Sequence, residues 1–151
     1  MIPRGSEGVD HLATRIAVDL IPKAADAYMG ADLGMLAGLV KMVGQDFDRA
    51  AQVLVSDNES LCAILREARP HIDDPALKAR MDAVLASRPA SLSIPDLNAD
   101  ADVAMRVLID LHAAVEDAAQ ATGAEWARRL DLSIWSFLDA YVAKRAYDSA
   151  F

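Results

Sequence analysis

The residues best placed to do chemistry are a histidine and a glutamate four positions apart. His112 and Glu116 have the spacing of neighbours on one helix face, close to the edge of an apolar stripe. Joined by a carboxylate from another helix, they would suit acid–base chemistry or metal binding. The Glu-x-x-His motif of carboxylate-bridged di-metal bundles does not occur in the sequence. We therefore expect no catalytic residue, metal or cofactor, and keep His112 with Glu116 as the alternative metal pair.

The single cysteine, Cys62, has no histidine near it in the sequence to act as a base. We interpret it as a small buried side chain. One cysteine also excludes an intrachain disulfide and a cysteine-rich metal cluster. A reducing cytoplasm is the compartment that this cysteine content favours.

Three residues are candidates for an interface. Gly34 and Gly38 lie one turn apart within a predicted helix, where each glycine costs about 1 kcal/mol relative to alanine unless another backbone approaches closely. That close contact would be to a helix of the same chain or, less favoured, to a second subunit. Trp135 lies between Asp131 and Asp139, beside an inward apolar line, which is typical of a rim that anchors a partner.

Composition limits the classes of function. The 151 residues suffice for one domain, with residues 1–8 as a flexible N-terminus and 9–151 as a single helical bundle. A net charge of −8 opposes binding to nucleic acid or to an anionic membrane surface. No apolar stretch reaches the 18 or so residues that membrane insertion requires.

Apolar spacing of three and four residues predicts helices along the whole chain, with no strand signal. The first helix starts near Val9, and Pro22 predicts a kink or break near Leu20 and Ile21. The next helix, near 32–55, is apolar around most of its circumference and is predicted to be central, with Phe47 on its core line. A capping box at Ser56 predicts a new short helix up to Pro70.

Further helices are predicted at 75–86, 99–122 and 124–147. Asp74 with Pro75 marks one helix start, and Gly123 suits a left-handed helix end. The segment 87–98, with Pro89 and Pro95, is the clearest loop and the point at which two sub-bundles would divide. The sequence therefore predicts an all-α, five- or six-helix, mainly antiparallel bundle.

These features favour a non-enzymatic helical protein that self-associates, as a homodimer, or docks on a protein partner. The first alternative is a bundle that binds a small apolar ligand, with Met35, Met42, Trp126 or Tyr141 lining its cavity. The second alternative is an enzyme that uses His112, Glu116 and a further carboxylate.

Overall fold

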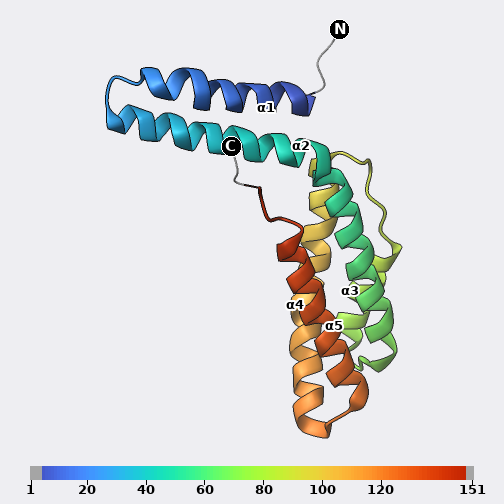
Figure 1. The fold of residues 1–151 in the computed structure, drawn as a ribbon. Helices are drawn as coiled ribbons and strands as arrows, with labels where there is room; N and C mark the ends of the chain where they lie inside the picture. The colour runs from blue at the N-terminus through green and yellow to red at the C-terminus, as the bar shows by residue number, and fades with distance from the viewer. Residues whose placement is uncertain (1–4, 149–151) are drawn as a thin grey trace. The chain divides into compact units, whose positions relative to one another are not determined.

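A computed structural model describes residues 5–148 and shows an all-helical chain (Figure 1). No strand occurs among these residues, so the predicted all-α class is confirmed. The chain divides into two compact units: the first comprises Met1–Ala50 with Ala146–Phe151, and the second is Ala51–Arg145. The described residues form five α-helices, which are α1 (Gly5–Arg15), α2 (Ala27–Ala68), α3 (Pro75–Ala86), α4 (Ile94–Thr122) and α5 (Glu125–Ala143).

Proline interrupts the helix that starts the first unit. Regular α-helix stops at Arg15, and a π-helical stretch (Ile16–Leu20) and a 3-10 turn (Ile21–Lys23) follow it. Pro22 lies in the 3-10 turn, where it has no N–H to donate and its ring crowds the preceding carbonyl groups. The kink or break predicted near Leu20 and Ile21 falls where the π-helical stretch changes to the 3-10 turn. Regular α-helix ends about one turn earlier, and the backbone leaves helical geometry at Ala24.

Small residues lie between α1 and the first part of α2. Ala13, Ala37 and Gly44 are the buried residues among those described in the first unit. A Cβ atom added to Gly44 would lie 3.2 Å from Val9 Cγ1, so a side chain at this position would push the two helices apart. The contact between these helices therefore buries small side chains and leaves most of the large apolar ones outside it.

The helix α2 continues through Ser56 and Asp57, so the predicted helix start at Ser56 is wrong. Asp57 is 1% exposed, and its carboxylate accepts hydrogen bonds from Lys144 Nζ at 2.9 Å and Arg145 Nη1 at 2.7 Å. Lys144 Nζ also donates to Ser56 Oγ at 3.0 Å. The side chains that the sequence suggested as caps instead bind the cations that follow α5, and the helix backbone is not interrupted.

The second unit encloses the main apolar core. Its fully buried side chains come from the last part of α2 and from α3, α4 and α5, whose apolar residues recur every three or four positions. This core holds His112 and Asp131 at its margin, with side chains 19% and 32% exposed. Its largest fully buried apolar members are Leu61, Leu65, Met81, Leu97, Leu111, Leu130 and Ile134.

Two predicted helix ends are confirmed. Asp74 Oδ1 accepts a hydrogen bond from the backbone N–H of Ala76 at 2.8 Å, and α3 begins with Pro75. Gly123 ends α4 in the left-handed region, with φ of 63°.

Helix α4 begins earlier than predicted. It starts at Ile94 because Ser93 Oγ accepts a hydrogen bond from the Asp96 N–H at 3.3 Å, and because a helix tolerates Pro95 in its first turn. The predicted loop 87–98 therefore reaches only to residue 93. The last helix also ends earlier than predicted, at Ala143.

The division into units differs from the sub-bundle boundary considered at 87–98, because it falls within α2, between Ala50 and Ala51. The burial pattern also does not confirm a central helix near 32–55: between residues 32 and 50 only Ala37 and Gly44 are buried, and Phe47 is 65% exposed. Residues 5–8 of the predicted flexible N-terminus belong to α1, whereas residues 1–4 lie outside the described part. Within residues 5–148, no helix has both the length and the apolar character needed to cross a membrane.

Candidate functional site

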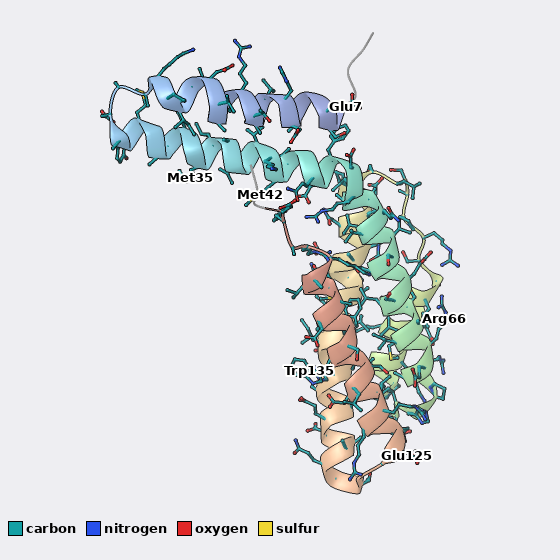
Figure 2. All side chains as sticks on the ribbon, in the orientation of Figure 1. Glu7, Met35, Met42, Arg66, Glu125 and Trp135 are labelled. Carbon is teal, nitrogen blue, oxygen red and sulfur yellow. The ribbon has the colours of Figure 1, made fainter. Side chains whose placement is uncertain are left out.

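Large apolar side chains line one exposed face of the first part of α2, called here the α2 face. Their exposed fractions run from 49% for Leu36 to 79% for Tyr28. At about 100° per residue, the six positions fall within an arc of about 120°. Figure 2 places Met35, with the half-buried Met42, on the side of α2 that is turned away from α1. The α2 face consists of Tyr28, Met35, Leu36, Leu39, Val43 and Phe47, and the Phe47 ring lies at its edge, next to Gly5 of α1.

The area of the α2 face is large for a surface with no partner. Each of these side chains offers on the order of 100 Å², so that the six together offer about 600 Å², at the upper end of the apolar patches that monomeric proteins expose. Patches of this size often mark interaction sites. The α2 face is therefore the strongest candidate for an interaction surface in the first unit.

The two glycines singled out in the sequence have different surroundings. A Cβ atom on Gly34 would lie 3.9 Å from Ile21 Cδ1, which is ordinary van der Waals contact within the same chain. A Cβ atom on Gly38 would meet nothing within 4 Å. Neither glycine belongs to the α2 face, so their interface role remains a prediction.

Trp135 lies on α5 with 52% of its surface exposed, at a margin of the second unit (Figure 2). Its indole ring makes an edge-to-face contact with the imidazole of His112, with ring centroids 5.5 Å apart and an interplanar angle of 78°. This contact limits the orientation of the imidazole and leaves part of the indole open to a partner. The tryptophan and the histidine, which sequence reasoning treated as separate features, belong to one site.

Two carboxylates surround the imidazole of His112. His112 Nε2 lies 2.9 Å from Asp131 Oδ1 on α5 and 3.7 Å from Glu116 Oε1 on its own helix, α4. The histidine and aspartate side chains are 19% and 32% exposed, and the glutamate is 52% exposed. The sequence analysis predicted a carboxylate from a second helix but did not identify it as Asp131. The sequence signal for Asp131 was its position one turn before Trp135.

A cavity of about 440 Å³ lies in the second unit among α2, α3, α4 and the segment that joins α3 to α4. Val55, Cys62, Val84 and Leu97 are among the apolar residues that line it. Asn58 also lines it: its Nδ2 donates to the Leu97 carbonyl at 3.3 Å, whereas its buried Oδ1 has no hydrogen-bond partner. The volume falls within the range of small-molecule sites.

The residues predicted to line a ligand cavity do not line this one. Met35 is exposed on the α2 face, and Met42 is half-buried in the first unit. Trp126 stacks on His71 with ring centroids 4.6 Å apart, and Tyr141 lies under the Arg145 guanidinium. These aromatic side chains already have partners within the fold, which the sequence pattern alone does not reveal.

Comparison with known proteins assigns neither a family nor a fold relative: no family model matches the chain, and neither a curated protein nor a solved structure matches it. The function of this chain must be inferred from the geometry of its own residues.

Proposed function

We propose that this protein acts by self-association, through a homodimer in which the α2 faces of two copies pack together. The observation that carries the proposal is the contrast within the first unit. Its described buried residues are Ala13, Ala37 and Gly44, whereas the six large apolar residues of the α2 face are exposed. Hydrophobic burial of these side chains is the main free energy that such an assembly would gain.

A second copy is the occupant that the area favours. A stable interface buries about 800 Å² on each partner, and the α2 face supplies about 600 Å² before the atoms around its rim are counted. In the dimer, α1 and the first part of α2 from each copy would pack through the two α2 faces and form a mainly antiparallel four-helix arrangement. In it, the segment near 32–55 would become the central apolar helix that its composition predicts.

The test is light scattering of the full chain over a range of concentrations. We expect a dimer, and Leu39→Glu or Val43→Glu should weaken it, because each removes about 2 kcal/mol of apolar burial and places a charge in the seam. That loss corresponds to a dissociation constant raised roughly 30-fold or more. A monomer at every concentration would contradict the proposal.

The matched control is Ile109→Glu, which introduces the same charge at a side chain that is 66% exposed on α4, in the second unit. This variant should dimerise as the unchanged chain does. Equal weakening by Ile109→Glu and Leu39→Glu would mean that added charge, and not the α2 face, controls association. Gly34→Leu is a poorer probe, because its side chain would press on Ile21 of the same chain.

The cavity supports a second candidate function, the binding of a small and mainly apolar ligand. The unpartnered Asn58 Oδ1 favours a ligand that carries one hydrogen-bond donor. A thermal-shift screen with small alcohols and phenols tests this, since a ligand at 100 times its dissociation constant should add about 2.7 kcal/mol of stability. Cys62→Phe would fill the cavity and should abolish the shift. A shift that survives in this variant would place the ligand elsewhere.

A further inference from the structure

The second unit brings together three metal-ligating side chains from two helices. His112 and Glu116 lie one turn apart on α4, and Asp131 approaches from α5. One ligand atom from each residue lies within 4.8 Å of the other two. The cluster forms only because α4 and α5 pack along their lengths.

The separations of these atoms match those of ligands on one small cation. Zinc binds histidine nitrogen and carboxylate oxygen at about 2.0–2.2 Å, so two ligands at tetrahedral or right angles are about 3–3.5 Å apart. The observed separations from His112 Nε2 are 2.9 Å to Asp131 Oδ1 and 3.7 Å to Glu116 Oε1. The oxygens of Glu116 and Asp131 lie within 4.8 Å of each other, and rotation of these two side chains, which are 52% and 32% exposed, would bring all three atoms to the separations required by one ion.

We propose that His112, Glu116 and Asp131 bind a divalent transition-metal ion of the zinc or cobalt class. The imidazole nitrogen selects this class over calcium and magnesium, which prefer ligand sets made wholly of oxygen. Two carboxylates neutralise the charge of the ion. Three protein ligands leave at least one coordination position open, as in metal sites that hold a reactive water.

A simpler role for the same residues is a hydrogen bond that pins α4 to α5. Because a carboxylate only accepts, the Nε2–H of the metal-free imidazole donates to Asp131 Oδ1. This bond does not involve Glu116, whose carboxylate lies 3.7 Å from Nε2. A metal ion uses all three side chains, so Glu116 distinguishes the two roles.

Isothermal titration of the metal-stripped full chain with zinc chloride tests the proposal. We expect one saturable site. Residues that merely orient a metal ligand contribute about 10- to 100-fold in affinity, so Glu116→Gln and Asp131→Asn should each weaken binding at least about tenfold. The control is Asp117→Asn, the carboxylate next to Glu116, which lies outside the cluster and should bind as the unchanged chain does. Glu116 is about half exposed, so its replacement leaves the fold intact.

Fluorescence locates the ion independently. The sequence contains two tryptophans, so in a Trp126→Phe background the emission comes from Trp135 alone, which contacts His112. Paramagnetic cobalt should quench this emission in step with binding, and Glu116→Gln should shift the quenching to at least about tenfold higher cobalt concentration. The proposal is overturned if no saturable site is found, if Glu116→Gln and Asp117→Asn bind alike, or if bound cobalt leaves Trp135 emission unchanged. Self-association through the α2 face stands or fails separately, because it involves none of these residues.

Discussion

Replacing Asp57 should destabilise the second unit selectively. The Asp57 carboxylate is 1% exposed and is held by Lys144 Nζ at 2.9 Å and Arg145 Nη1 at 2.7 Å. Arg145 Nη1 also donates to the Tyr141 carbonyl at 3.0 Å, and its guanidinium covers the Tyr141 ring. These contacts attach the residues that follow α5 to the middle of α2.

The magnitude follows from the hydrogen bonds that are lost. A hydrogen bond to a charged group contributes about 1.5–3 kcal/mol, so two such bonds set an upper value near 6 kcal/mol for Asp57→Ala. The side chains of Lys144 and Arg145 are 34% and 32% exposed, so both recover part of their hydration when the carboxylate is removed. We therefore expect Asp57→Ala to lower the free energy of unfolding by about 3 kcal/mol.

Replacing both cations with methionine should cost more, about 3–5 kcal/mol, because a buried carboxylate is then left without a partner. The triple variant Asp57→Leu, Lys144→Met and Arg145→Met should cost less than the cation pair alone, because no unpaired charge remains. A smaller loss for the triple variant than for the cation pair would show that the losses are not additive. Such a result indicates a buried ion cluster and not a general loss of packing.

Urea denaturation followed by tryptophan fluorescence measures these changes, because Trp126 and Trp135 both lie in the second unit. Glu59→Ala is the control, since Glu59 lies on the same helix and is exposed. The reasoning would be refuted if Asp57→Ala lowered the free energy of unfolding by less than about 1 kcal/mol. It would also be refuted if the triple variant lost as much free energy as the sum of the losses for the replacement of Asp57 and of the two cations.

Two further expectations concern the end of α4 and the segment after α5. Gly123→Ala should lower the free energy of unfolding by about 1 kcal/mol, because a residue with a Cβ atom is strained at φ of 63°. Gly123→Asn should lower it by less, because asparagine tolerates this conformation better. Equal losses for the two variants in urea denaturation would contradict this. Tyr147 Oη donates to Asp46 Oδ2 at 2.7 Å, and this bond, followed by burial and the charge of Asp46, raises the pKa of Tyr147 above its ordinary value. Because the folded-state pKa is the higher one, the stabilisation is complete below the unfolded-state pKa and is lost as the pH rises through the folded-state pKa. Alkaline absorbance titration should therefore show a tyrosine with a raised pKa in the unchanged chain and not in Tyr147→Phe. If Tyr147 has an ordinary tyrosine pKa in the unchanged chain, the bond to Asp46 does not form.

Local signals in the sequence predicted those helix ends that depend on neighbouring residues. Asp74 with Pro75, and Gly123, act through the backbone within a few residues, so their roles could be predicted without the fold. Ser56 and Asp57 carry an equally good local signal, but α2 continues through them. Lys144 and Arg145, distant in the chain, occupy their side chains, and sequence spacing does not contain that information.

The residues of the candidate sites were likewise predicted only in part from the sequence. The apolar character of the segment near 32–55 was evident from the sequence, but a helical pattern does not specify whether an apolar face is buried within the chain or exposed as the α2 face. His112 and Glu116 share a helix face by spacing alone, whereas Asp131 joins them only through the packing of α4 on α5. The sequence by itself determined the all-α class, the helix ends set by local caps, and the pairing of residues one turn apart. Only the tertiary structure decided the division into two units, the burial of Asp57 and the convergence of the three ligands, because each depends on contacts between residues far apart in the chain.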